Sequence, residues 1–184
     1  MIGDRRVIVA AGLAARAYIA VAVECPFEGL VAPAVVVALA EQMLAAGADE
    51  IVFADTIGAA SPGQVRTLLQ AAAPSVPIGQ TAVHLHDTRG FGVAGAWAAL
   101  ECGVRRFDAS VGGIGGCPFA PGAAGNVATE DLVLLAQQSG LHTGIALDGL
   151  AAAVAFAEQQ LDRPLGGRSM GWHRRKQLKQ AAAA

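Results

Sequence analysis

The sequence is short of charge, of cysteine and of long apolar runs, and each shortage excludes a class of protein. Only 15% of its residues are charged and the formal net charge is −2, so we expect no nucleic-acid partner. Its three cysteines form no Cys-x-x-Cys pair, which argues against a disulfide framework or a zinc site and fits a reducing cytoplasm. No run approaches the roughly 18 apolar residues of a membrane span, so we expect no membrane partner.

What the chain does contain is apolar and small. Hydrophobic residues make up 54% of its 184 residues, mean hydropathy is +0.47, and alanine and glycine abound. This length suffices for one domain with a sizeable core. The composition suits a buried parallel sheet covered by alanine-rich helices.

Strand and helix patterns alternate along the chain, which predicts an α/β fold with right-handed parallel crossovers. The predicted strands are 18–23, 50–55, 82–86 and 106–111, and the predicted helices are 33–46, 61–73, 92–102, 129–139 and 147–161. Ser61 and Pro62 form a typical helix start. Polar residues collect where strands end, which is where barrel enzymes place their chemistry.

Two histidines end the third predicted strand. Because strand side chains alternate between faces, His84 and His86 should point the same way, as one half of a divalent-metal site. The plainer alternative is that both imidazoles hydrogen-bond carbonyl groups.

A glycine-rich segment, 112–126, follows the fourth strand and is predicted to be a mobile loop that closes over a substrate. Cys117 lies within it, where a nearby cation would favour the thiolate; the alternative is a small buried hydrophobe. Cys25 and Cys102 are interpreted as buried hydrophobes.

Five segments of the chain resemble signature segments of the 3-hydroxy-3-methylglutaryl-CoA lyase family. They are ECPFEG at 24–29, ADTIGAASPG at 54–63, HLHDTRG at 84–90, SVGGIGGCPFA at 110–120 and GAAGNVATEDL at 122–132. The cysteine loop is specific to the lyases, whereas His-x-His and Asp-Thr-Ile-Gly are shared with metal-dependent acyltransferases and aldolases on the same barrel. The resemblance runs from about residue 16 to about residue 163.

The resemblance implies half of a TIM barrel, four β/α units corresponding to strands five to eight. Residues 1–15 would be an extension without a family match, 16–163 the half barrel, and 164–184 a basic tail. Within that tail, the run 174–179 is interpreted as a solvated helix end, with phosphate binding as the lesser alternative. The family's first-strand arginine and aspartate are not matched, because Asp4, Arg5 and Arg6 lack the following pattern. We expect a fragment, a half that pairs with a separate N-terminal half-barrel chain, or a homodimer. An open half would expose sheet edges.

By the same resemblance, the chain would cleave an acyl-CoA substrate, 3-hydroxy-3-methylglutaryl-CoA, into acetoacetate and acetyl-CoA. His84, His86 and Asn126 would hold Mg²⁺ or Mn²⁺, and Cys117 would transfer a proton. Asp55 would orient the substrate or share in acid–base chemistry, and Glu130 would support the metal ligands. Each carboxylate has a structural alternative, a cap for Asp55 and a first-turn residue beside the helix dipole for Glu130.

Two other functions remain open from the sequence. One is a catalytically silent half-barrel subunit, favoured by the unmatched arginine and aspartate. The other is a 2-oxo-acid aldolase or acyl-CoA synthase of the same barrel superfamily, which the run from Gly115 to Pro118 argues against, because a synthase has no need of that thiol.

Overall fold

The computed structural model describes residues 12–116 and 125–182. Its strands are β1 (Arg16–Ile19), β2 (Glu24–Cys25), β3 (Gly29–Leu30), β4 (Glu50–Asp55), β5 (Thr81–Leu85) and β6 (Arg106–Asp108). Its α-helices are α2 (Pro33–Ala45), α3 (Pro62–Ala72), α4 (Gly92–Glu101), α5 (Thr129–Gln138), α6 (Leu147–Leu161) and α7 (Arg168–Ala181). Two short 3-10 turns, η1 (Ile78–Gln80) and η2 (Val111–Gly113), precede β5 and follow β6.

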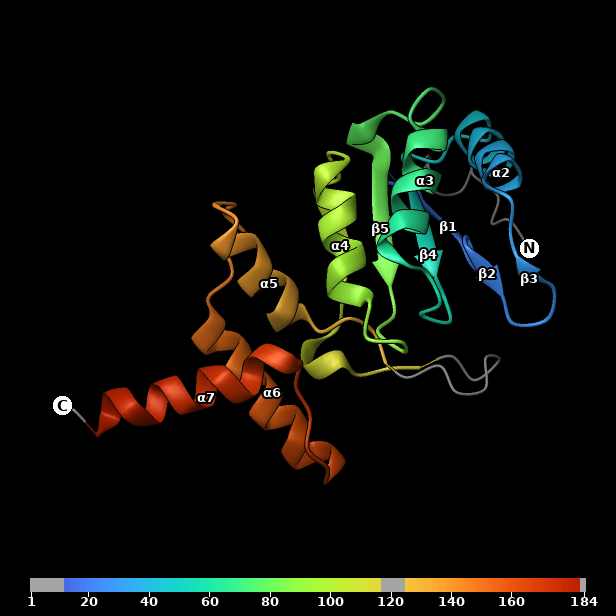
Figure 1. Ribbon diagram of the computed structural model, residues 1–184. Helices are drawn as coiled ribbons and strands as arrows, with labels where there is room; N and C mark the ends of the chain where they lie inside the picture. Colours follow the sequence, from blue (N-terminus) through green and yellow to red (C-terminus); the bar gives the residue numbers. More distant parts are fainter. Residues whose placement is uncertain (1–11, 117–124, 183–184) are drawn as a thin grey trace.

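Four strands form one parallel sheet in the order β1-β4-β5-β6, with helices between them (Figure 1). All four point the same way, so their carboxyl ends meet at one edge, the lower edge in Figure 1. The α/β fold with parallel crossovers predicted from the alternating pattern is therefore confirmed.

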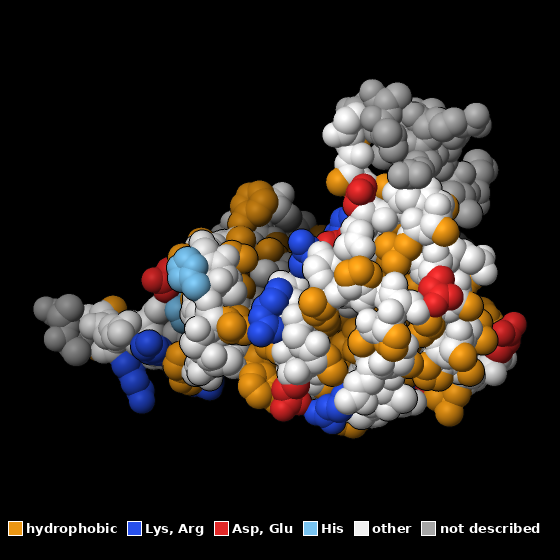
Figure 2. Space-filling model, turned by 90° about the horizontal axis from the view of Figure 1, so that it is seen from above, with side chains coloured by type: hydrophobic (Ala, Val, Ile, Leu, Met, Phe, Trp, Pro, Cys, Tyr) orange, Lys and Arg blue, Asp and Glu red, His pale blue; other side chains and the backbone are white. Residues whose placement is uncertain are grey.

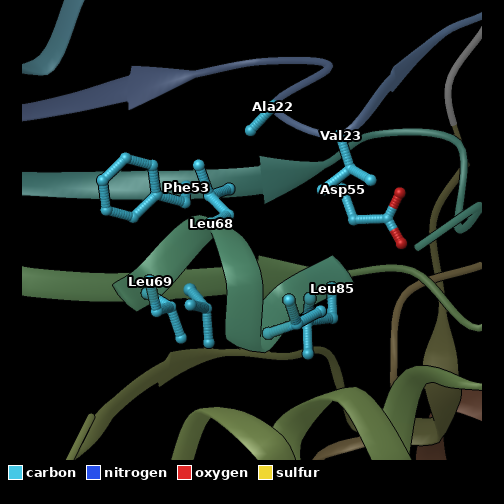
Figure 3. A pocket seen from close by; sticks show the side chains of 9 residues that line it. Ala22, Val23, Phe53, Asp55, Leu68, Leu69 and Leu85 are labelled. Atoms are coloured by element: carbon cyan, nitrogen blue, oxygen red, sulfur yellow. The ribbon is translucent and has the colours of Figure 1, made fainter. Parts of the chain in front are cut away.

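One face of this sheet packs against helices α2, α3 and α4 (Figure 1). Every second strand residue points into that layer, because strand side chains alternate. The core contains Ile19, Ile51, Phe53, Val83 and Leu85 from the strands, and Val36, Val65, Leu68, Leu69, Ala96 and Ala99 from the helices. Figure 3 shows part of this layer, in which Phe53 and Leu85 face Leu68 and Leu69.

The opposite face of the sheet is polar. Arg16 and Tyr18 of β1 reach Asp108 of β6 across it, with Arg16 Nη2 3.0 Å and the Tyr18 hydroxyl 2.6 Å from carboxylate oxygens. These two strands lie at opposite edges, which a flat sheet would hold about 14 Å apart. The sheet therefore curves toward this face, which we call the concave face.

Two predicted strands end earlier in the structure. β1 stops at Ile19 rather than at residue 23, because Val21 adopts a left-handed conformation (φ 49°) and its amide donates to Thr56 Oγ1 instead of a neighbouring strand. β6 stops at Asp108, and the chain then enters η2, where Gly112 has φ 67°. The antiparallel hairpin β2–β3 was not predicted.

The helices agree with their predicted ranges to within one residue at each end. Ser61 caps α3 through a reciprocal capping box with Gln64, as its position before Pro62 predicts.

The run 174–179 lies in α7 and is exposed apart from the half-buried Arg174, which agrees with a solvated helix end, whereas the first part of α7 is packed. α7 buries Met170 and His173 against the body, while Lys and Arg side chains gather toward the projecting end of the chain (Figures 1 and 2). Among the described residues, none of the helices has the length and apolarity needed to cross a membrane.

Candidate active site

The two predicted histidines lie side by side at the carboxyl end of β5. Their ring centroids are 5.2 Å apart, as expected for positions two apart on one strand. His84 pairs in register with Ala54 of β4 and Asp108 of β6, so its side chain belongs to the concave face. His86 lies just beyond the strand and is buried.

Asn126 is brought to the same place by a segment that returns from far along the chain. His86 and Asn126 form an antiparallel bridge. On either side of it, the Val127 amide donates to the Leu85 carbonyl at 3.0 Å and the Asp87 amide donates to the Gly125 carbonyl at 3.2 Å. The structure thus brings together the three residues predicted to share a cation.

The amide of Asn126 is oriented by its own loop. Asn126 Nδ2 donates to the Ile114 carbonyl at 2.8 Å, and this leaves Oδ1 as the available oxygen. That oxygen is buried and accepts no hydrogen bond from the described residues. Gly115 permits the close approach, because its φ is +119° and an added Cβ would lie 2.5 Å from Asn126 Nδ2.

A carboxylate lies beside His84. Asp108 Oδ2 is 3.8 Å from His84 Nδ1, and the Tyr18 ring meets the His84 ring edge-on with centroids 6.3 Å apart. The Tyr18 hydroxyl donates to the same carboxylate. This hydrogen bond raises the pKa of the Tyr18 phenol, and the partial burial of the phenol and the negative charge of Asp108 act in the same direction. Arg16 holds Asp108 and also pairs with Glu50.

Asp55 faces the other way. It pairs in register with Leu85, on the helix-covered side of the sheet, and Figure 3 shows it beside Val23 and Leu85. Its oxygens accept the amides of Ala59 and Ala60 at 2.9 and 3.0 Å.

Burial raises the pKa of the Asp55 carboxyl, although these two backbone hydrogen bonds and the nearby charges of His86 and Arg89 act in the opposite direction. The contacts support the capping interpretation of Asp55, and its catalytic role stays a prediction.

Glu130 is fully buried at the start of α5. Its oxygens accept the amides of Gly112 at 3.1 Å and Gly167 at 2.7 Å. It therefore ties η2, which follows β6, to the start of α7. Support of the metal ligands by Glu130 remains a prediction, since its described contacts are with backbone amides.

Two further polar residues have structural contacts. Asp87 accepts the Gly92 amide at 2.7 Å at the start of α4. Glu24 of β2 pairs with Arg89 at 3.1 Å. This ion pair holds the β2–β3 hairpin near the turn that follows β5.

Cys117 lies outside the described residues, so its predicted proton-transfer role and the closure of its loop stay predictions. The other two cysteines, Cys25 and Cys102, are free thiols and half-buried, less enclosed than the predicted buried hydrophobes.

The chemistry of these donors fits part of a site for Mg²⁺ or Mn²⁺. The two imidazoles are neighbours, Asn126 is bridged to His86 through the backbone, and Asn126 Oδ1 is a buried acceptor whose hydrogen-bonding capacity no described residue uses. Over the described ranges, however, no three His, Cys, Asp or Glu side chains cluster closely enough to hold a metal. The donor set is neutral, whereas hard cations favour carboxylate ligands.

The polar contacts of Tyr18 and Asp108 were missed from the sequence. A signal for them was present: polar residues occupy alternate positions in β1 and β6, at 16 and 18 and at 106 and 108. In strands whose other face is apolar, this period of two indicates a polar second face.

Comparison with known proteins finds relatives that are acyl-CoA lyases. A family profile described as HMGL-like matches residues 5–156. The chain is 42% identical over 160 residues to hydroxymethylglutaryl-CoA lyase YngG of Bacillus subtilis, an alignment covering 87% of this chain and 54% of that protein. It is 48% identical over 154 residues to (R)-citramalyl-CoA lyase of Chloroflexus aurantiacus, covering 84% and 49%.

The fold agrees with the sequence match. The crystal structure of the Bacillus subtilis HMG-CoA lyase superposes with a TM-score of 0.87 at 39% identity, covering 92% of this chain and 57% of that one. The chain thus spans about half the length of the curated relatives it matches.

Proposed function

This chain belongs to the HMGL-like family, whose members among its relatives are carbon–carbon lyases, and from that premise we propose that it supplies one half of the active site of a hydroxymethylglutaryl-CoA lyase. The observation that carries the proposal is the placement of His84 and His86 side by side at the carboxyl edge of the sheet, with Asn126 bridged to His86. The substrate would be 3-hydroxy-3-methylglutaryl-CoA, and the products acetoacetate and acetyl-CoA.

The proposed reaction is a retro-aldol-type cleavage. A base removes the proton of the C3 hydroxyl, the C3 oxygen forms the new carbonyl, and the C2–C3 electron pair passes to the acetyl-CoA enolate. An acid then protonates C2. We assign proton transfer to Cys117, by family resemblance. Asp55 remains a candidate partner, because its charge lies near His86.

His84, His86 and Asn126 would hold the divalent cation, which supplies polarisation of the substrate oxygens and fixes their geometry when bound. The chain's own contribution is orientation. The Ile114 carbonyl aims the Asn126 amide oxygen, and the strand aims both rings at one side.

We further infer that the sheet is half of a TIM barrel and that further β/α units close it. Three observations support this: the sheet curves toward its polar face, β1 and β6 are its outer strands, and the alignments cover about half of each relative's length. The closing units would belong to a longer form of this chain, to a separate half-barrel chain or to a second copy of this one.

The test is a complementation assay. We expect the chain alone, with Mn²⁺, to show little or no cleavage of 3-hydroxy-3-methylglutaryl-CoA. Co-expression with the unmatched half of the Bacillus subtilis lyase should restore turnover. In that complex, Cys117→Ala should abolish most activity and leave Mn²⁺ binding intact. Full turnover by a proven monomer, insensitive to Cys117→Ala, would contradict the assignment of both the cysteine and the missing half.

A second substrate is favoured by one specific observation, the 48% identity to a (R)-citramalyl-CoA lyase. The same complementation should therefore be run with both thioesters, and the higher kcat/KM identifies the substrate. If neither thioester is cleaved by any closed assembly, the chain is a catalytically silent half barrel.

A further inference from the structure

Arg16, Tyr18 and Asp108 form a hydrogen-bonded network beside His84. Arg16 and Tyr18 both donate to Asp108, at 3.0 and 2.6 Å, and Asp108 Oδ2 in turn faces His84 Nδ1 at 3.8 Å. Arg16 also pairs with a second carboxylate, that of Glu50. The Tyr18 hydroxyl donates its hydrogen to Asp108. The carboxylate is therefore held from two sides and presented to the imidazole.

The surroundings of His84 Nδ1 make the contact with Asp108 important. His84 Nδ1 is buried and makes no hydrogen bond to the described residues, so the Asp108 carboxylate is the charged group it faces. A neutral imidazole carries its proton on one nitrogen, and an adjacent carboxylate favours the proton on the nitrogen that faces it. The gap of 3.8 Å is longer than a hydrogen bond, so the contact between the carboxylate and the ring is electrostatic.

We propose that Asp108 is a positioning residue for His84, holding its proton on Nδ1 so that Nε2 carries the lone pair, and that Tyr18 holds Asp108 in place. The use of Nε2 as a metal donor rests on the proposed function. The tautomer itself is a property of the metal-free chain and can be measured without that function.

The experiment is long-range ¹H–¹⁵N correlation NMR on the full, metal-free chain labelled at histidine. It is recorded at about pH 8, where an ordinary imidazole is neutral. The chain has four histidines, so His84→Gln assigns the resonance. We expect His84 in the Nδ1–H tautomer. Asp108→Asn should remove that preference, and Tyr18→Phe should weaken it.

The matched control is Glu101→Gln, which alters an exposed carboxylate paired with Arg66 on the helix layer and should leave the tautomer unchanged. A His84 tautomer protonated on Nε2 in the unaltered chain overturns the proposal, as does a tautomer insensitive to Asp108→Asn. If Asp108→Asn does not fold by circular dichroism, the unaltered chain and Tyr18→Phe decide the matter.

A second readout separates this inference from the proposed function. Mn²⁺ titration followed by electron paramagnetic resonance should show about 10-fold or greater weakening in Asp108→Asn, the range typical of partners behind metal ligands. The expected tautomers, combined with no lyase turnover in the complemented assembly, would uphold the positioning role and reject the lyase. Unchanged Mn²⁺ affinity in a folded Asp108→Asn chain would reject the positioning role.

Discussion

At the scale of single residues, the conformation of one glycine and the burial of one carboxylate govern the carboxyl edge of the sheet. Gly115 permits the close approach of the Asn126 amide, and the Asp55 carboxylate accepts hydrogen bonds from two backbone amides. Both arrangements depend on close contacts, so single substitutions should have measurable effects.

Gly115→Ala should displace Asn126, because a Cβ at this position would lie 2.5 Å from Nδ2 and φ is +119°. We expect weaker Mn²⁺ binding and a loss of about 1–3 kcal/mol in the free energy of unfolding. Urea denaturation and Mn²⁺ titration measure these. Gly149→Ala is the control, since Gly149 has open space around it and lies within α6, where alanine should not destabilise the chain.

Asp55→Asn should destabilise the chain by about 1–3 kcal/mol, because an amide cannot accept both the Ala59 and Ala60 hydrogens. The folded-state pKa of Asp55 is raised, so its contribution to stability is full below the unfolded-state value and falls as pH rises through the folded-state value.

Urea denaturation across this pH range should therefore show that the difference in the free energy of unfolding between the unaltered chain and Asp55→Asn becomes smaller as pH increases. A gap that widens with pH would contradict the sign of the pKa shift.

At the scale of elements, the start of α7 depends on side chains of α5. Asp131 accepts the amides of Arg168 at 2.9 Å and Ser169 at 2.8 Å, and the neighbouring Glu130 accepts the Gly167 amide. These are the free amides that every helix presents at its start. Two adjacent acidic residues of one helix thus cap another, and α7 is held where Met170 and His173 can be buried.

Asp131→Ala should release the first turn of α7. Capping residues typically contribute about 0.5–2 kcal/mol, and hydrogen exchange of the α7 amides should accelerate accordingly. Glu101→Ala, which breaks the exposed ion pair with Arg66, should cost less than about 1 kcal/mol. Equal exchange in both variants would show that apolar packing alone holds α7.

At the scale of the whole molecule, one face of the sheet is fully packed and the other is polar and curved. Apolar side chains are exposed on both flanks, with Val35 of α2 55% exposed on one side and Phe156 of α6 64% exposed on the other. In a closed barrel these flanks would meet further β/α units. Exposed apolar side chains and open sheet edges are liabilities for a chain by itself.

The chain by itself should bind Mn²⁺ weakly, with a Kd above the micromolar range. Among the described residues, its candidate donors are two imidazoles and an amide, without a carboxylate in the set to offset dehydration of a hard cation. Calorimetry on a sample of known oligomeric state measures this. Submicromolar binding by the monomer would contradict it, whereas tight binding that appears only with dimerisation would identify a second copy as the closing unit.

The sequence by itself determined the order and type of most elements and the common face of His84 and His86, because both follow from local periodicity. The capped start of α3 was likewise local, since it needs only Ser61, Pro62 and Gln64. The hairpin β2–β3 and the early end of β1 could not be predicted, because Val21 takes its unusual backbone conformation from a tertiary contact with Thr56.

Only the tertiary structure decided which polar groups meet. Asn126 reaches His86 because a returning segment bonds to the end of β5, and Tyr18 reaches Asp108 because the sheet curves. Asp55 faces the helices because its register places it beside Leu85. A strand's own pattern shows that its two faces differ. Which groups from other strands share a face depends on register and curvature, and these are set by packing between segments distant in the chain.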